Sequence, residues 1–489
     1  MRGYRTILAV MTAAAMAIGG AVARAGDAPD GKPAGQPKTD AAAAKPTQSD
    51  APATKKDGKA AADAKKAEKL FDEGRDALFR GKYAEAVKLL KRAAAADKTK
   101  TRYRLYLARA HRYAGQAADA EKLLAAIVKA SPDHVEAGQM LAELLAARQK
   151  WDEVVKVLER LLKYRHDYPT YHMLAEAKYN LDDHEKARKY FEEAIKLNPT
   201  SASDHYQLGN IYLAGNFFAL AAGSYQRALA LGYRSPVLHY KLGSAYFNLR
   251  NYFGRVAEVT VKSGKVGTIN GAWYLIEPVP GRKDLFRAAP RSSAIHQVAK
   301  ALETGLKEDR DIRFLRTNIY LNARRYKQAY AMFKKIAAEA SDPTTPKGDR
   351  ALFRYYFAQA AFGVGKYDEY LKLLTEAIGL DPQAYKATLV DAYLRVAEQH
   401  NQNGDLDGYI KYLRMAVEDA PRKVPPHLKL GSAYEEARRY PEAVVQWRMV
   451  LDLEPDHPKR MALLDLIRKY ADTPRPAPPK KKPAAKKAG

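Results

Sequence analysis

Cysteine is missing from this chain of 489 residues. Its absence excludes disulfide bonds, thiolate metal sites, cysteine nucleophiles and a lipid-modified cysteine behind a signal peptide. Acidic residues are also few, since 56 Asp and Glu stand against 83 Lys and Arg and leave a formal net charge of +27. Most of that charge lies between residues 67 and 470 rather than at the two ends. A basic field attracts anionic partners such as nucleic acid, acidic polymers and anionic membranes, although it can equally serve only to keep a protein soluble.

Long apolar runs are scarce as well, and the one that stands out covers residues 7–22. It follows Arg2 and Arg5 and precedes the small-residue site Ala23-Arg24-Ala25, which is the layout of a secretory signal peptide. The run is short for a membrane-spanning helix, which needs roughly 20 apolar residues, so an uncleaved anchor is the weaker alternative. We therefore expect residues 1–25 to be a signal peptide and the protein to be exported to the periplasm or cell envelope, or secreted. Export argues against nucleic acid as the partner of the basic surface.

Two further segments lack the large apolar side chains from which a core is built. Residues 26–66 consist mainly of Ala, Lys, Pro and Asp, and such a composition cannot offset the entropy of ordering, so it predicts a disordered linker. Residues 471–489 form a Pro/Lys/Ala tail of the same kind, expected to be a mobile cationic arm. The lysines of this electrostatic tail are Lys480, Lys481, Lys482, Lys486 and Lys487.

The rest of the chain repeats itself. Gly209 and Gly243 lie 34 residues apart, each inside a similar phrase, and a third copy of the phrase occupies residues 428–434. Self-similarity at one fixed period indicates a repeat architecture.

These phrases resemble the tetratricopeptide repeat family, whose 34-residue unit is a helix-turn-helix. Its pattern has small residues at positions 8, 20 and 27, large residues at 11 and 24, and a proline near 32. Three units carry it here, through Gly209, Tyr212, Ala221, Tyr225 and Ala228, through Ala175, Ala187, Phe191, Ala194 and Pro199, and through Gly431, Tyr434, Ala443, Trp447 and Pro455. Further units start near residues 67, 101, 135, 310, 351 and 390. The small residues let helices approach closely, and the proline ends the second helix because it has no N–H.

The resemblance implies an all-α fold, a right-handed α-solenoid of about ten helix-turn-helix units with a concave inner wall, because one unit cannot bury its apolar face alone. We expect units 1 to 6 (first part) in residues 67–252, and the remainder of unit 6 with units 7 to 10 in residues 292–457. Residues 458–470 are expected to form a capping helix whose apolar side carries Met461, Leu464 and Ile467.

The pattern breaks inside the sixth unit, at residues 253–291. Alternating β-branched residues bounded by Ser263-Gly264 and Asn270-Gly271 predict short strands joined by tight turns, a β-hairpin-like insert. Helical periodicity returns at residues 292–307, as a displaced second helix. Insertions in repeat arrays mark one face, often the binding face. The insert could contact a partner, or it could simply pack against the array.

In the repeat family, positions 2, 5, 9, 12 and 13 of each first helix line the concave groove. Aromatic rings there would supply flat apolar pockets, and amides could bond an extended peptide backbone in both directions. The resemblance places these residues in a peptide-binding groove: Tyr206, Asn210, Tyr240, Ser244, Phe247, Asn248, Phe314, Asn318, Asn322, Tyr355 and Gln359. Several of these rings could instead pack between units.

Charge also varies along the wall. The unit at 101 offers Arg102, Arg109 and Arg112, and the unit at 135 offers Glu136 and Glu143. The units at 390 and 424, toward the opposite end, offer Asp391, Glu398, Glu435 and Glu436. These groups could orient a ligand or could simply be solvated faces.

Some family members grip a C-terminal carboxylate with Lys at position 5 and Asn at position 9. Here Asn210 holds position 9, but Tyr206 replaces the Lys, and only Lys241 resembles a later basic member. The carboxylate clamp is therefore incomplete.

Nothing in the sequence points to catalysis. His166, His172 and His184 are spaced by 6 and 12, whereas metal ligands on one helix want spacings of 3 or 4. Phosphate-loop, hydrolase and zinc-protease motifs are missing, so we expect no enzyme, catalytic residue, metal or cofactor.

The leading hypothesis is an exported scaffold or adaptor that binds a peptide or partner protein in its groove, in envelope assembly, secretion or maintenance. The alternative is an electrostatic tether to an anionic envelope polymer or membrane surface through the basic body and Lys-rich tail. Salt sensitivity separates them, because exposed charges are screened as ionic strength rises.

Overall fold

The computed structural model describes residues 55–261, 268–269, 273–282, 284–340 and 342–471. The predicted signal peptide, most of the predicted linker and the Lys-rich tail lie outside these residues and stay predictions. The chain divides into two compact parts, Met1–Leu249 (the N-terminal part) and Arg250–Gly489 (the C-terminal part).

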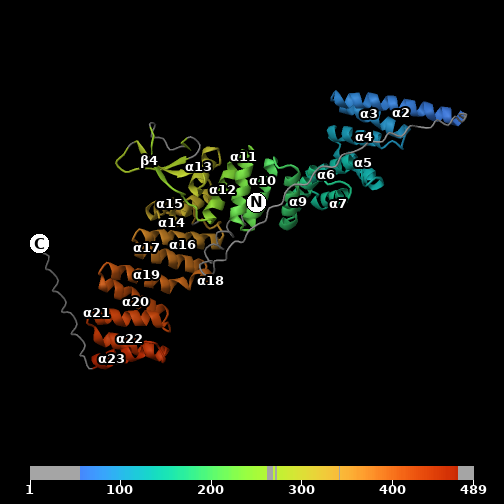
Figure 1. Ribbon diagram of the computed structural model, residues 1–489. Coiled ribbons are helices and arrows are strands. Elements are labelled where there is room, and N and C mark those ends of the chain that lie inside the picture. Colours follow the sequence, from blue (N-terminus) through green and yellow to red (C-terminus); the bar gives the residue numbers. More distant parts are fainter. Residues whose placement is uncertain (1–54, 262–267, 270–272, 283, 341, 472–489) are drawn as a thin grey trace, which may run out of the picture. The chain divides into compact units, whose positions relative to one another are not determined.

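The N-terminal part consists of helices that pack on their neighbours in chain order (Figure 1). Five successive pairs run from α2/α3 to α10/α11, and α12 follows as the first helix of a sixth unit. The helices are α2 (Lys55–Phe79), α3 (Tyr83–Ala96), α4 (Thr101–Tyr113), α5 (Ala117–Ala130), α6 (Val135–Ala147), α7 (Trp151–Leu162), α8 (Tyr168–Asn180), α9 (His184–Leu197), α10 (Ala202–Ala214), α11 (Phe218–Ala230) and α12 (Pro236–Asn248).

Helix α2 begins at Lys55, so the predicted linker boundary at residue 66 is wrong. Ala and Lys, which dominate this stretch, are among the strongest helix formers. The helix is packed from Ala67 and Phe71 onward, and both side chains are buried. A packed end provides the costly first turn, and favourable residues then extend the helix toward the N-terminus.

The C-terminal part opens with a small sheet and continues as helices. Pairs α14/α15, α16/α17, α19/α20 and α21/α22 pack together, and α23 covers the last pair. The elements are β1 (Ala257–Thr260), β2 (Thr268–Ile269), β3 (Trp273–Pro278), β4 (Leu285–Pro290), α13 (Ala294–Glu303), α14 (Arg310–Asn322), α15 (Tyr326–Ala340), α16 (Lys347–Gly363), α17 (Tyr367–Leu380), α18 (Pro382–Tyr385), α19 (Thr388–Gln402), α20 (Leu406–Asp419), α21 (Val424–Glu436), α22 (Tyr440–Leu453) and α23 (Arg460–Tyr470).

A left-handed residue marks the turn after each first helix. These ten residues are Gly81, Gly115, Gln149, Asp182, Asn216, Arg250, Arg324, Gly365, Gly404 and Arg438. The next residue typically donates its N–H to a carbonyl five residues back, as Lys82 does to Ala77 at 2.9 Å, which is a Schellman-type helix end. Ten such turns within the described residues confirm the predicted number of about ten units.

Inside a unit, the small and large positions of the pattern meet. A Cβ added to Gly209 would lie 2.6 Å from the Tyr225 ring, and the same substitution at Gly431 would collide with Trp447. Tyr225 is fully buried and Trp447 is nearly so. The all-α repeat fold is therefore confirmed, together with the packing rule from which it was predicted.

The insert is a four-stranded antiparallel sheet rather than a single hairpin. Its strand order is β1-β4-β3-β2, with Val259 opposite Phe286 and a bulge in the β3–β4 pairing. Phe286, Leu275 and Ala288 are buried in a core of its own, with Val259 and Val261 packed against it. Alternation predicts strands but not their order, because order depends on contacts between residues distant in sequence. The Ser263-Gly264 and Asn270-Gly271 turns lie outside the described residues.

Three short helices refine the prediction. Helix α13 falls inside the expected segment 292–307 and packs on α14, β3 and β4. Helix α18 was not predicted, because four residues carry no usable periodicity. Helix α23 matches the capping helix, but its apolar side was partly wrong: Leu463 and Ile467 are buried, whereas Met461 is 67% exposed.

Candidate functional site

The first helices α10 and α12 carry a connected set of polar and aromatic side chains. Tyr206 of α10 stacks on Tyr233, with ring centroids 4.6 Å apart. The Lys241 ammonium of α12 lies 5.2 Å from the Tyr206 ring centroid, which is a cation–π distance. This contact joins the first helices of two neighbouring repeats, on the face that the repeat register predicts to be the concave wall.

Asn210 is the centre of this set. Its Oδ1 accepts hydrogen bonds from the Tyr225 hydroxyl at 2.9 Å and from Lys241 Nζ at 2.7 Å. Its Nδ2 donates to Gln207 Oε1 at 2.8 Å. The amide is buried and held by both of its ends, so its orientation is fixed.

Lys241 has no carboxylate partner within the described ranges of the chain. Burial lowers its pKa to about 8, because removing water disfavours the charged amine. Burial also raises the pKa of the Tyr206 hydroxyl to about 12, so that group stays neutral beside it. Lys241 is therefore a half-buried cation that contacts a neutral amide oxygen and an aromatic face.

The remaining predicted residues of the N-terminal part lie on α12. Tyr240 and Ser244 are buried, whereas Phe247 and Asn248 are half-buried. Asn248 Nδ2 donates to the Ser244 carbonyl at 2.9 Å, and its buried Oδ1 has no hydrogen-bond partner.

In the C-terminal part, three predicted residues form a ladder along α14. Asn318 Nδ2 donates to the Phe314 carbonyl and Asn322 Nδ2 donates to the Asn318 carbonyl, each at 2.9 Å. Asn318 is only 1% exposed and its Oδ1 accepts no hydrogen bond. A buried acceptor without a hydrogen-bond partner is uncommon in folded proteins.

The last two predicted residues lie on α16. Tyr355 stacks on Tyr385 of α18, with centroids 5.0 Å apart, and Gln359 Oε1 accepts a hydrogen bond from Arg395 at 3.0 Å. The eleven predicted groove residues thus form two groups, one in each part of the chain. Their role in binding stays a prediction.

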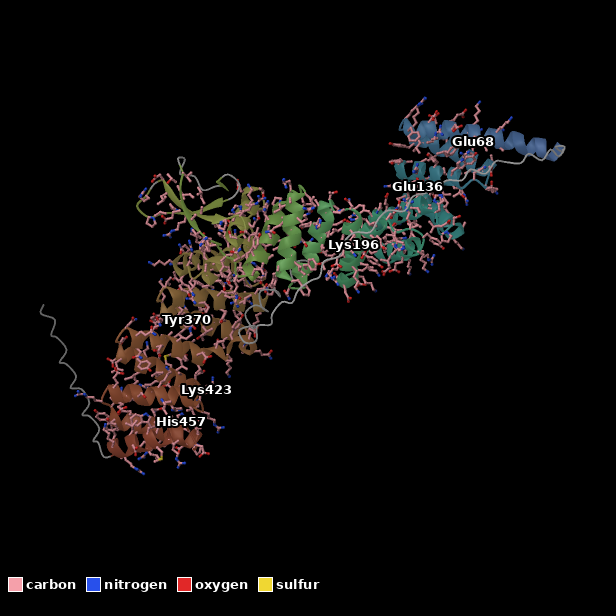
Figure 2. All side chains as sticks on the ribbon, in the orientation of Figure 1. Glu68, Glu136, Lys196, Tyr370, Lys423 and His457 are labelled. Carbon is pink, nitrogen blue, oxygen red and sulfur yellow. The ribbon has the colours of Figure 1, made fainter. Side chains whose placement is uncertain are left out.

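The charged residues near the N-terminus pair with each other instead of forming separate patches. Arg112 Nη1 lies 2.5 Å from Glu143, Arg109 pairs with Glu136, and Arg102 pairs with Glu68. Glu68 and Glu136 are labelled in Figure 2. Each bridge joins one repeat to the next, which leaves less net charge to orient a ligand.

A second polar cluster, missed by the sequence reasoning, lies one repeat earlier. His172 and Glu176 of α8 precede Tyr206 and Asn210 by 34 residues each, so they occupy the same repeat positions, 5 and 9. His172 Nδ1 lies 2.6 Å from Asp204 of α10. The repeat register itself was the signal, because it places both residues on the predicted wall.

Among the described residues, no group of three His, Cys, Asp or Glu side chains could hold a metal ion. The same part of the chain contains no helix that is long and apolar enough to cross a membrane.

Comparison with known proteins identifies the repeats. Family models described as tetratricopeptide repeat match residues 77–133, 111–177, 168–201 and 206–253. The chain is 26% identical over 362 residues to the TPR repeat-containing protein YpiA of Bacillus subtilis (strain 168), covering 67% of this chain and 82% of that protein. A shorter match, 26% identical over 158 residues, covers 31% of this chain and 18% of the human Protein O-mannosyl-transferase TMTC1.

Solved structures of low identity were also found. MamA (41-end) from Desulfovibrio magneticus RS-1 is 22% identical, covers 34% of this chain and 94% of its own, and gives a TM-score of 0.32. YrrB, described as a TPR protein with an unusual peptide-binding site, is 17% identical, covers 46% of this chain and 92% of its own, and also gives 0.32. The family models show tetratricopeptide repeats in residues 77–201 and 206–253, and the register of buried small and large residues, with the left-handed turns, extends the same helix-turn-helix architecture through the described residues.

Proposed function

We propose that this protein is an exported, non-catalytic scaffold that binds a partner polypeptide along the wall formed by α8, α10 and α12. Tetratricopeptide units supply a stacked series of first helices, and a stack of this kind offers an extended surface suited to a polypeptide. The wall carries rings and amides rather than a nucleophile beside a base, which supports binding over catalysis.

The observation that carries the proposal is the Lys241 ammonium. A half-buried cation is costly unless it is paired, and its nearest groups are Asn210 and Tyr206, which are neutral. A carboxylate from a partner would neutralise the Lys241 ammonium through a charge-assisted hydrogen bond. The proposed partner therefore presents an acidic group to α12, with the Tyr206 ring beside it.

Export to the cell envelope is supported only by the sequence. The Arg2 and Arg5 pair, the apolar run of residues 7–22 and the Ala23-Arg24-Ala25 site have the layout of a signal peptide. Edman sequencing of the protein purified from its source tests this part, since cleavage would leave Gly26 at the N-terminus.

The groove is tested by partner capture with matched lysine variants. The full chain, its Lys241→Met variant and a Lys411→Met control are each used as bait in an envelope extract at high salt. Lys411 also lies over a tyrosine ring, at 4.7 Å from Tyr412, but it is exposed and in the other part. We expect a discrete partner to be retained by the wild type and the control and lost from Lys241→Met. Equal retention by all three would overturn the proposal.

The electrostatic tether is a second candidate, favoured by the Lys-rich tail and the net charge of +27. Binding through exposed charges collapses as ionic strength rises. Deletion of residues 471–489 should abolish such binding and leave capture by the wall intact.

A further inference from the structure

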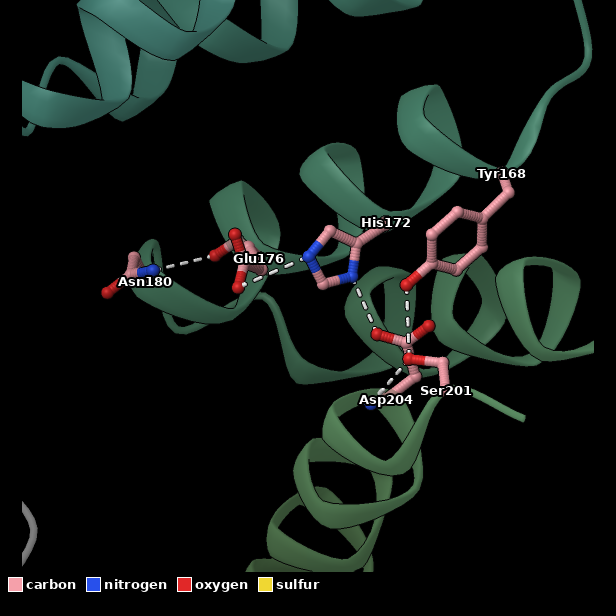
Figure 3. Close-up of polar contacts among 6 residues, drawn as sticks. All are labelled: Tyr168, His172, Glu176, Asn180, Ser201 and Asp204. Atoms are coloured by element: carbon pink, nitrogen blue, oxygen red, sulfur yellow. Dashed lines mark hydrogen bonds and ion pairs between the residues drawn. The ribbon is translucent and has the colours of Figure 1, made fainter. Parts of the chain in front are cut away.

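His172 is held between two carboxylates that come from consecutive repeats (Figure 3). Its Nδ1 lies 2.6 Å from Asp204 Oδ1 on α10, and its Nε2 lies 3.6 Å from Glu176 Oε1, one turn further along α8. Asp204 is fully buried, whereas the Glu176 side chain is 41% exposed. The imidazole thus bridges a buried carboxylate to one that faces solvent.

The surroundings of the ring are otherwise uncharged. Tyr168 of α8 stacks on the imidazole at 5.5 Å, and Phe191 of α9 meets it edge-on at 6.4 Å. The Tyr168 hydroxyl donates to Ser201 Oγ at 3.0 Å, and that oxygen caps α10 by accepting the Asp204 N–H. The bridge is therefore anchored at the first turn of α10, and among the described residues Asp204 and Glu176 are the charges that act on His172.

Charge balance makes the bridge dependent on protonation. Burial of the ring lowers the pKa of His172, but the hydrogen bond and charge of Asp204, together with the charge of Glu176, outweigh it and raise that pKa above its ordinary value. When the imidazole is neutral, the carboxylate of Asp204 is buried without a counter-charge, which is a costly state. Its second oxygen, Oδ2, already has no hydrogen-bond partner.

We propose that His172 and Asp204 form a proton-dependent clip between consecutive repeats, closed when the imidazole is charged and loosened when it is neutral. The clip joins the first helices of two repeats across 32 residues of sequence. Each repeat contacts only its neighbours, so the repeats before the clip communicate with those after it only through this interface. A weaker interface therefore uncouples the two groups of repeats.

The sign of the effect follows from linkage. A histidine whose pKa is raised in the folded state adds stability that is fully present below the unfolded pKa and lost as pH rises through the folded value. A difference of one pH unit between the pKa of His172 in the closed and in the open state corresponds to about a tenfold change in the ratio of these states. The clip should therefore be closed below the ordinary pKa of histidine and should loosen as pH rises through the raised pKa of His172.

The first test is an NMR titration of the histidine side chains in the full chain. The His172 signal is assigned by its loss in His172→Gln, and the same chain unfolded in urea provides the reference midpoint. We expect the His172 midpoint in the folded chain to lie above its value in the unfolded chain, and we expect Glu176→Gln, a change at a solvent-facing site, to lower it. A folded midpoint at or below the unfolded one would overturn the clip.

The second test reads the interface directly. Hydrogen exchange of the amides in the first turn of α10, corrected for the intrinsic rate at each pH, is measured from pH 5.5 to 8.5. Protection in the wild type should exceed that in His172→Gln by several-fold at low pH, and the two should converge as pH rises. A His166→Gln control should follow the wild type throughout. If His172→Gln keeps the wild-type pH dependence, His172 is only a packing residue and the proposal fails.

Discussion

Replacing Gly209 by alanine tests the packing rule that defines the repeats. An alanine Cβ at this position would lie 2.6 Å from Cε1 and 2.7 Å from Cδ1 of Tyr225, well inside contact distance. The ring cannot move aside easily, because Tyr225 is fully buried and its hydroxyl is held by Asn210. Gly223, on the partner helix of the same unit, provides a matched control, since a Cβ there would meet no atom within 4 Å.

Both variants gain helix propensity, but only one of them introduces a steric clash. Glycine in a helix interior is about 0.8–1 kcal/mol less favourable than alanine, so both substitutions gain this amount. Only the change at Gly209 overpacks the core, which costs about 1–3 kcal/mol. The difference between the variants cancels the helix propensity, and we expect Gly209→Ala to be less stable than Gly223→Ala by about 1–3 kcal/mol.

Hydrogen exchange of α10 and α11 is the suitable assay, because long repeat arrays need not unfold as one unit. Gly223→Ala should increase protection in both helices, whereas Gly209→Ala should lower it relative to that control. Equal stabilisation by both variants would refute the close-approach argument for position 8.

Other substitutions test the last repeats, the helix caps and the proposed site. Trp447→Ala should cost about 3–5 kcal/mol, measured by hydrogen exchange of the amides in α21 and α22, and a loss under about 1 kcal/mol would mean that the ring does not fill the core. Asp309 caps α14 by accepting the Ile312 N–H at 3.0 Å, so Asp309→Ala should cost about 1 kcal/mol, seen as faster exchange in the first turn of α14; an unchanged rate would contradict the cap. The pKa of Lys241 falls from 10.5 to about 8, so the unfolded state binds more protons between these values and stability should rise with pH over that window. Lys241→Met should remove the rise, and its persistence would assign it to another group.

The repeat fold could be predicted because its rules are local. Small residues such as Gly209 and large ones such as Tyr225 recur at a fixed spacing, and turns follow at the same period. Local rules failed where the signal was short or weak. Helix α18 has four residues, and the start of α2 at Lys55 depends on a packed turn further along the helix as well as on its helix-favouring Ala and Lys residues.

The site was harder to predict because its contacts cross from one repeat to the next. Lys241 and Asn210 are 31 residues apart, and their contact depends on which rotamers face each other on neighbouring helices. Spacing within one helix indicates only that His172 is a poor metal ligand, whereas its partner Asp204 lies 32 residues away. Register gives the positions on the wall, but pairing and burial come only from the stacked structure.

Site-specific photocrosslinking tests the central claim most directly. A photoreactive phenylalanine derivative replaces either Phe247, half-buried on α12 of the proposed wall, or Phe217, which is 59% exposed near the start of α11. The full chain is crosslinked in cells of its natural source. We predict one discrete polypeptide adduct from position 247, absent from position 217 and lost when Lys241→Met is added. Identical adducts from both positions, or no adduct from position 247, would contradict the proposal that this wall binds a partner.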